Sequence, residues 1–457
     1  MLTAALGALA IPSSAQAIGV SGTAAPDDTT AGAHSNFVID MDFTGGQVRD
    51  LTIGLPAGMV GDPTATPKCT VAQLNANACD DTGADSTVVG EVSAQANILT
   101  IIGPITVPGT LFNLDPQPGE PARFGIVLTP PVGDPIILQS AVQLRPTDFG
   151  LNTVINDIPN TTLLDGDTTI VSETITLYGT APGSGKPFMR NPTSCASATT
   201  NFSAVPYTGT TGTGQASFTP TNCGSLPFSP TFSARMGSPG QNDVLGKPPV
   251  STVIEQDADE AGLAEAKVLL PPDLGVDLAQ LNEICPLDLF NAAACPPNTV
   301  VGSALATSPL LTQPLTGPVT LVQQPVLPDI GLNLAGPLSL NLHGTLDISG
   351  SVTFSELPDI PISHFELNFI GGPDGLNVAN RNLCLPPAPL FHENFTGHNG
   401  ATASLDTFAT VEGGCGPVKK KCKAKGKKKK GKKSDASAAK KKKQKKSCKK
   451  KKKRKKK

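Results

Sequence analysis

A pair of cysteines followed along the chain by a strand-like Thr-Val-Val-Gly segment occurs twice in this sequence. Cys69 and Cys79 lie ten positions apart and precede Ser86-Thr-Val-Val-Gly90, while Cys285 and Cys295 precede Asn298-Thr-Val-Val-Gly302. Five further anchors keep the same order: Gly103–Val107 with Gly317–Leu321, Phe124–Leu128 with Ile330–Leu334, Asp157–Pro159 with Glu356–Pro358, Asn191–Cys195 with Asn380–Cys384, and Cys223-Gly224 with Cys415-Gly416. We therefore predict a tandem duplication, with modules at 35–224 and 225–416.

Glycine and proline limit each module to β structure. The 457 residues include 46 Gly and 43 Pro, which interrupt helices of ordinary length but suit strands joined by turns. Alternating segments recur every eight to twelve residues, typical of antiparallel sandwiches. They are Asn36–Phe43, Val48–Pro56, Ile136–Leu144, Thr168–Tyr178, Ala264–Pro272, Leu338–Leu346, Ser351–Phe354 and His364–Phe369. The predicted fold class is all-β, with one large or two small β-sandwiches in each module.

One short helix is expected between the cysteines of each repeated pair. Thr70 can cap it, and Val71 and Leu74 share the i, i+3 spacing of Leu287 and Phe290. A helix across all ten steps would hold the two cysteines about 15 Å apart, whereas a disulfide needs Cα atoms within about 7 Å. A bridge therefore requires one or two helical turns, with the second cysteine on the returning chain.

Eight cysteines in the body predict export into an oxidising compartment. Their separations alternate between short and long, which favours sequential pairing, although sequence alone does not prove connectivity. The predicted bridges are Cys69–Cys79, Cys195–Cys223, Cys285–Cys295 and Cys384–Cys415. Reduced buried thiols in a cytosolic protein are the alternative.

The first residues resemble a secretory signal. A short apolar run ends in Ser13-Ser14-Ala15-Gln16-Ala17, a small-residue cleavage pattern, so residues 1–17 are interpreted as a signal peptide. An apolar leader of another kind is the alternative. Residues 18–34 are predicted to be a flexible N-terminal segment. No later stretch approaches the roughly 18 uninterrupted apolar residues of a membrane span. The expected location is secreted or at the cell surface.

The C-terminal end carries an extreme charge. From Pro417 onward, 25 Lys and one Arg face a single Asp, so the tail carries +25 and the remaining chain −27. With almost no apolar residue to bury, residues 417–457 are predicted to be disordered. The tail also holds Cys422 and Cys448, which could pair with each other or crosslink chains.

Such a tail binds polyanions through counterion release, without specificity. Anionic cell-wall polymers and lipid headgroups are the expected partners. No specific nucleic acid is expected, because no aromatic residues are interleaved for base stacking. Self-association of the tail with the acidic body, and a merely solubilising tail, are the alternatives. The candidate polyanion-binding residues are Lys419, Lys420, Lys421, Lys427, Lys428, Lys429, Lys430, Lys440, Lys441, Lys442, Lys443, Lys449, Lys450, Lys451, Lys452, Lys453 and Arg454.

Together these motifs resemble a known group of proteins. The Leu-Pro turn, the Cys-x9-Cys pair, the Thr-Val-Val-Gly strand, the Gly-Pro-Ile/Val-Thr strand, the late cysteine pair and the Lys-rich end look like the exported tandem-repeat proteins of high-GC actinobacteria. The resemblance covers residues 35–457. It implies export and a β-rich fold, and it carries over no catalytic residue.

Motifs for catalysis and metal binding fit poorly. Gly179–Lys186 resembles a phosphate loop, but five residues separate Gly179 from Gly185 and Pro187 stands where Ser or Thr would hold magnesium, so a turn is favoured. His392 and His398 are six positions apart on a Gly-rich stretch, and solvated loops are favoured over a metal site. The acidic runs Asp165-Gly-Asp167 and Asp257–Glu260 match no EF-hand, so acidic turns are favoured over calcium binding.

No serine-nucleophile elbow is present, and the chain has no Trp to serve as a sugar platform. The sequence thus predicts no catalytic residue, cofactor or metal. It predicts an exported, non-catalytic structural or adhesive protein of the cell envelope, tethered by its tail. A secreted ligand-binding sandwich is the first alternative, and an unrecognised hydrolase the second.

Overall fold

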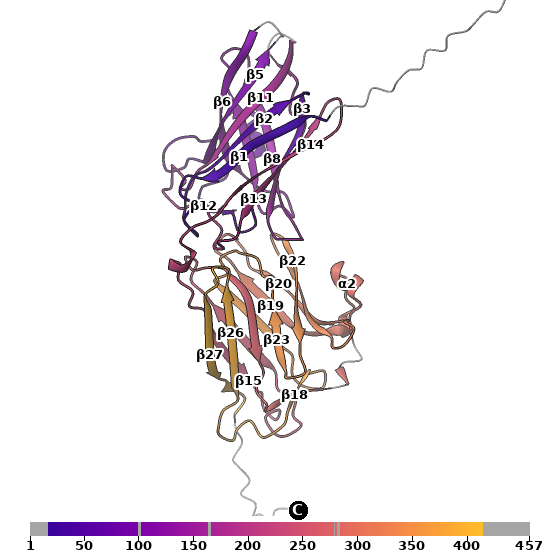
Figure 1. The fold of residues 1–457 in the computed structure, drawn as a ribbon. Coiled ribbons are helices and arrows are strands. Elements are labelled where there is room, and N and C mark those ends of the chain that lie inside the picture. Colours follow the sequence, from indigo (N-terminus) through magenta and orange to yellow (C-terminus); the bar gives the residue numbers. More distant parts are fainter. Residues whose placement is uncertain (1–16, 99–101, 163–165, 278, 281–283, 415–457) are drawn as a thin grey trace, which may run out of the picture. The chain divides into compact units, whose positions relative to one another are not determined.

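The computed structural model describes residues 17–98, 102–162, 166–277, 279–280 and 284–414. The predicted signal peptide, apart from Ala17, and the predicted tail lie outside these ranges. The described residues form a nearly all-β fold of mainly antiparallel strands, with two sheets of twelve strands each and two small sheets of two strands, β4 (Val60–Gly61) with β12 (Met189–Arg190) and β18 (Leu274–Val276) with β25 (Asn377–Ala379). Strands Gly19–Pro26 to Gly212–Phe218 supply the first module, and strands Thr231–Met236 to Thr410–Val411 supply the second (Figure 1).

The first module contains β1 (Gly19–Pro26), β2 (Phe37–Thr44), β3 (Val48–Gly54), β4 (Val60–Gly61), α1 (Val71–Asn75), β5 (Val88–Ile98), β6 (Ile102–Leu114), β7 (Arg123–Leu128), β8 (Ile136–Leu144), β9 (Leu151–Ile155), β10 (Thr161–Thr162), β11 (Gly166–Leu177), β12 (Met189–Arg190), β13 (Ala198–Pro206), β14 (Gly212–Phe218) and the 3-10 turn η2 (Cys223–Ser225). The predicted strands around 36–43, 48–56, 136–144 and 168–178 are confirmed by β2, β3, β8 and β11.

The second module contains β15 (Thr231–Met236), β16 (Val250–Glu255), β17 (Leu263–Leu269), β18 (Leu274–Val276), α2 (Leu287–Asn291), the 3-10 turn η4 (Pro297–Thr299), β19 (Val300–Thr307), β20 (Leu315–Val322), β21 (Asp329–Ala335), β22 (Ser339–Leu346), β23 (Ser351–Phe354), β24 (His364–Phe369), β25 (Asn377–Ala379), β26 (Leu390–Gly397), β27 (Thr402–Phe408) and β28 (Thr410–Val411). Here too the predicted strands are confirmed, by β17, β22, β23 and β24.

The two sheets share one topology, which confirms the tandem duplication. The first runs β1-β2-β11-β5-β6-β7-β8-β9-β3-β13-β14, and the second, counted from β15, runs β15-β16-β24-β19-β20-β21-β22-β23-β17-β26-β27. Each position in one order has its counterpart in the other, from β1 with β15 to β14 with β27. A short added strand, β28, lies on the outer edge of the second sheet.

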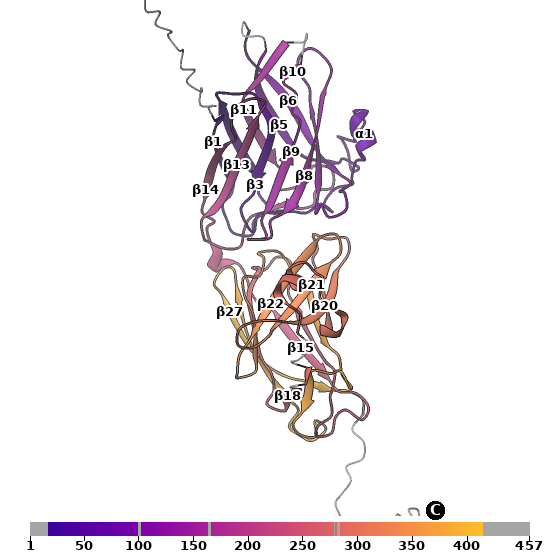
Figure 2. The same cartoon turned by 90° about the vertical axis from the view of Figure 1, so that its right-hand side faces the viewer.

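The outer strands of each sheet come together, so each module is a sandwich of two layers. In the first module, Ile18 N donates to Thr210 O over 3.2 Å, beside a parallel bridge between Ala17 and Thr210. In the second, β28 pairs in parallel with β15 through Arg235 and Thr410. Edges that meet in this way leave little open strand for pairing with other chains. Figures 1 and 2 show the layers of each module from two sides.

Each repeated cysteine pair holds a one-turn helix against its sheet, as predicted. Cys69–Cys79 and Cys285–Cys295 are disulfides with Cα atoms 5.5 Å apart in both cases. Thr70 caps α1 through a reciprocal bond with Gln73, whereas Pro286 precedes α2 without such a cap. The entry to both helices is fixed by parallel bridges, Cys69 with Leu114 and Cys285 with Val322.

One apolar side chain of each helix enters the sheet. Leu74 of α1 and Phe290 of α2 are buried, and they contact Gly125 and Gly331, the places where β7 and β21 lack a side chain. A methyl group at Gly125 would lie 2.5 Å from Leu74 Cδ1. Leu287, expected on the buried face together with Phe290, is 43% exposed instead.

The glycine of each Thr-Val-Val-Gly motif sits at a β-bulge. The register between β5 and β6 shifts between Val88 and Gly90, and that between β19 and β20 shifts between Val300 and Gly302. A Cβ at Gly90 would overlap the carbonyl oxygen of Thr176 on the neighbouring strand, and one at Gly302 would overlap that of Asn368. The repeated glycine therefore permits close approach of two backbones.

Two expectations differ from the structure. Residues 18–34, predicted to be flexible, include β1, which pairs with β2 along its whole length from Gly19 to Pro26. Its side chains alternate between the core and the solvent. Hydrogen bonding to β2 holds this segment as a strand although its composition is rich in Gly and Ala. The predicted match of Gly103 with Gly317 is also wrong. Gly109 pairs with Val92, two residues after Gly90, and Gly317 pairs with Ala304, two residues after Gly302, so Gly109 is the structural counterpart of Gly317. The β5–β6 hairpin is longer than the β19–β20 hairpin, so the similar sequence at Gly103 lies six residues before the structural counterpart.

Candidate ligand-binding cavity

The residues predicted to act in chemistry divide into two groups. The polyanion-binding residues, from Lys419 to Arg454, all lie outside the described residues. Among the eight body cysteines, the structure holds the predicted bridges Cys69–Cys79, Cys285–Cys295 and Cys195–Cys223, the last with Cα atoms 5.9 Å apart. Cys384 is disulfide-bonded too, and Cys415, its predicted partner, lies outside the described residues.

The weaker motifs have structural roles. Gly179–Lys186 forms a tight turn in which Gly185 N donates to Ala181 O over 2.9 Å, at a positive φ of 68°. His392 contacts Asp406 through Nδ1, while His398 Nε2 contacts Leu357 O, so the two imidazoles face different partners. Among the described residues, no three His, Cys, Asp or Glu side chains gather as a metal site would require. Their helices also include none long and apolar enough to cross a membrane.

The interior of the second module contains a cavity that the sequence did not predict. It lies between the two layers and has a volume of about 110 Å³. Leu, Val, Ile, Phe and Ala side chains from β15 to β18, from β20 to β24 and from the loops between them make up its wall. Only Thr252, Gln256 and Asn377 among the lining residues are polar. The corresponding interior of the first module is nearly filled, with a void of about 20 Å³.

One strand accounts for much of this difference. Phe37 on β2 pairs with Leu177, which pairs with bulge residue Gly90; Val250 on β16 pairs with Phe369, which pairs with Gly302. Every second residue along the chain from these matched positions faces the core. In the first module these residues are Phe37, Ile39, Met41 and Phe43, and at the same places in the second they are Val250, Thr252, Ile254 and Gln256.

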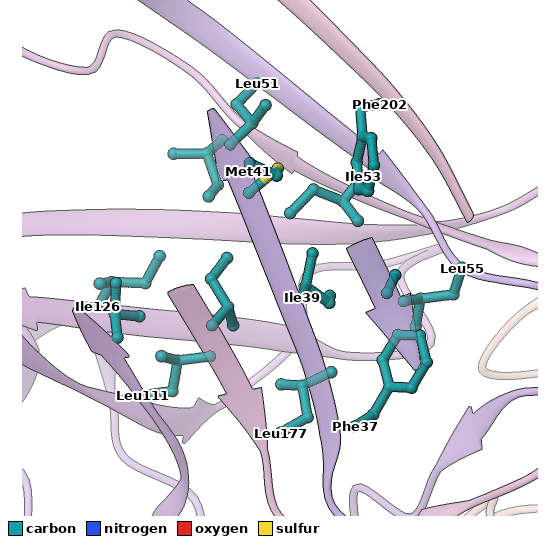
Figure 3. Close-up of a cluster of buried hydrophobic side chains, with 14 of the residues drawn as sticks. Phe37, Ile39, Met41, Leu51, Ile53, Leu55, Leu111, Ile126, Leu177 and Phe202 are labelled. Carbon is teal, nitrogen blue, oxygen red and sulfur yellow. The ribbon is translucent and has the colours of Figure 1, made fainter. Parts of the chain in front are cut away.

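A second strand adds to it. Leu51 on β3 pairs with Ile155, and its counterpart on β17 is Ala266, which pairs with Phe354. Figure 3 shows Phe37, Ile39, Met41 and Leu51 among the side chains that fill the first core. Smaller side chains on two facing strands leave the space that the second module keeps open.

The three polar side chains of the cavity wall differ in their hydrogen bonding. Thr252 Oγ1 donates to Leu367 O over 3.4 Å, and Gln256 Nε2 donates to Ala261 O over 2.6 Å. Asn377 is 5% exposed, and its Nδ2 has no hydrogen-bond acceptor among the residues that the structure describes. A buried amide donor without a partner costs about 1–3 kcal/mol, and a ligand oxygen at this place would remove that cost.

Three glutamates of the described residues are buried: Glu173 in the first module, and Glu260 and Glu393 in the second. The pKa values of Glu173 and Glu393 are raised. Burial raises the pKa of Glu173 on β11 to about 7. On β26, burial raises the pKa of Glu393 to about 7 as well, while the bond from Thr407 Oγ1 acts in the opposite direction. Glu393 pairs with Val268 in the second module, and the equivalent pair in the first module is Phe202 with Ile53. Glu393 therefore stands where the first module has a core phenylalanine. The two carboxyls lie at different strand positions, and neither has a His or Ser hydrogen-bond partner in the described structure, which gives no support to a catalytic role.

Comparisons with known proteins add little. No protein-family model and no curated protein matches this chain. Among solved structures, the C-terminal domain of the Streptococcus pyogenes antigen I/II-family protein AspA shares 7% identity, covers 86% of this chain and 100% of that one, and has a TM-score of 0.19. A Corynebacterium diphtheriae protein described as membrane anchored shares 7% identity, covers 87% and 95%, and has a TM-score of 0.20. At these TM-scores neither likeness bears on the function of this chain.

Proposed function

We propose that this chain is an exported, non-catalytic protein of the cell surface, structural or adhesive in role. The disulfides carry this proposal, because two of them staple the same helix in both modules and disulfides persist in oxidising compartments outside the cytosol. The closed sandwich edges would also limit edge-to-edge pairing with other chains.

The Lys-rich residues after Pro417 would supply the attachment. Their charge of +25 is opposite in sign to that of cell-wall polymers and anionic lipid headgroups. Lys acts as a point charge, so the attachment would follow charge density and not the identity of the polymer.

Fractionation of the native host tests this proposal. The full chain is expected in the cell-surface fraction and is expected to be released by about 1 M salt, where the Debye length falls to about 3 Å. A chain lacking 417–457 is expected in the medium. A matched control keeps the tail length but replaces its Lys by Gln, and it should be released like the deletion. Retention of all three proteins in the cell-surface fraction, at low salt and at about 1 M salt, would contradict attachment through the tail.

Capture of an apolar ligand inside the second module is the second candidate function. The observation that favours it is the open cavity of that module beside the nearly filled core of the first. Isothermal titration with a small hydrocarbon should show one site, which Val250→Phe removes.

A further inference from the structure

Val276 of β18 is the most exposed of the residues that line the cavity, at 43%, and we therefore place the mouth of the cavity beside β18. Its partner across the β18–β25 pair is Asn377 of β25. The unpaired amide of Asn377 is therefore next to the mouth, while the space behind it is walled by aliphatic and aromatic side chains. A ligand that enters here would meet a hydrogen-bond donor first and hydrocarbon surface afterwards.

The charges around this mouth favour a neutral ligand. Asp277 follows Val276 directly and forms an ion pair with Lys247. Lys247 Nζ also donates to Pro373 O over 2.6 Å, so this cation is already satisfied. A ligand carboxylate would meet the Asp277 carboxylate and no unpaired cation among the described residues at this end. An uncharged carbonyl oxygen can accept from Asn377 without that repulsion.

Resting on the second candidate function above, we propose that this cavity binds a short acyl chain in ester linkage. The hydrocarbon chain lies between the layers, and the ester carbonyl oxygen accepts a hydrogen bond from Asn377 Nδ2. The cavity, at about 110 Å³, is smaller than the roughly 150 Å³ apolar cavity that holds a benzene-sized guest. It therefore fits a short chain or the end of a longer one.

Isothermal titration of the full chain with methyl hexanoate, hexane and hexanoate tests the assignment. About 1 M salt suppresses binding of hexanoate to the Lys-rich tail, since the Debye length is then about 3 Å. We expect methyl hexanoate to bind tighter than both other probes. Asn377→Leu should weaken methyl hexanoate about tenfold and leave hexane within about twofold, because only the ester uses the amide. Asn394→Leu, at an exposed position of β26, is the matched control and should change neither affinity.

Two variants fill the cavity with the side chains of the first module. Val250→Phe and Ala266→Leu should each abolish binding of methyl hexanoate and hexane while keeping a cooperative thermal transition. Two variants on different strands keep the test valid if one of them fails to fold.

Several outcomes would overturn the proposal: no heat from methyl hexanoate, binding that survives both filling variants, or equal losses for ester and hexane in Asn377→Leu. Hexane binding without any dependence of the ester on Asn377 would leave a ligand-binding cavity but remove the ester assignment. None of these results bears on attachment through the tail.

Discussion

Val250 occupies, in the second module, the strand position that Phe37 occupies in the first. The two are matched through the same chain of pairings, by way of Phe369 and Leu177, to the repeated bulge glycines. Phe37 is fully buried and fills the space between the layers, whereas Val250 lines an open cavity. One duplicated scaffold thus has a packed core in one copy and a cavity in the other.

Shortening a side chain in the core of the first module should lower the free energy of unfolding. Phe37→Val would open in the first module a void like that of the second, and we expect it to lower the free energy of unfolding by about 2–4 kcal/mol. Denaturant unfolding followed by circular dichroism measures the loss. Val250→Ala, which enlarges an existing cavity, is the matched control and should cost less. A loss below about 1 kcal/mol for Phe37→Val would show that the first core collapses around the change.

The repeated disulfide should stabilise its module through the unfolded state. Replacing Cys285 and Cys295 together by Ser removes a bridge across ten residues, and a loop of that size predicts a loss of about 3 kcal/mol. The same double change at Cys69 and Cys79 is the internal comparison, because its loop has the same length. Thermal unfolding of both variants gives the values. An unchanged midpoint in both would mean that the helices are held by packing alone.

The repeated bulge glycines should not accept a side chain. Gly90→Ala and Gly302→Ala would each drive a Cβ into a carbonyl oxygen of the adjacent strand. We expect each to lower the free energy of unfolding by about 2 kcal/mol or more, as strained or overpacked sites do. Gly224→Ala serves as control, because a Cβ there meets nothing within 4 Å. Equal stability of all three variants, measured by denaturant unfolding, would contradict the close approach.

The stability of the first module should rise as the pH is lowered from 8 to 5. Burial raises the pKa of Glu173 from 4.5 to about 7, so the folded state binds a proton that the unfolded state releases between these values. The unfavourable contribution is absent below pH 4.5, grows as the pH rises through 7, and reaches about 3 kcal/mol above it.

Glu173→Gln should remove the part of this dependence that Glu173 contributes, leave the part that Glu393 contributes, and raise the free energy of unfolding at pH 8. The exposed Glu91→Gln on the neighbouring strand β5 is the control and should leave the pH profile unchanged. Denaturant midpoints at four or five pH values supply the profile. A Glu173→Gln profile that parallels the wild type would assign the dependence to other groups, Glu393 among them.

Local chemistry let the sequence predict the scaffold. Gly and Pro excluded long helices, alternation marked strands such as β8 and β23, and ten-residue cysteine spacing demanded a one-turn helix before a returning chain. Each of these features depends on residues close together in the sequence. The same reasoning was wrong for β1, because a Gly- and Ala-rich segment becomes a strand only when β2 supplies its hydrogen-bond partners.

What the sequence determined by itself was the repeat, the all-β class, the spacing of the cysteines and the opposite charges of the body and the tail, since spacing, composition and charge are written directly in the chain. The tertiary structure alone decided that the second module has a cavity and that Asn377 beside it has no hydrogen-bond acceptor among the described residues. Val250, Thr252 and Ala266 look like ordinary strand residues in sequence. The space they leave depends on which side chains face them across the two layers, and register and sheet closure bring those side chains together from distant parts of the chain.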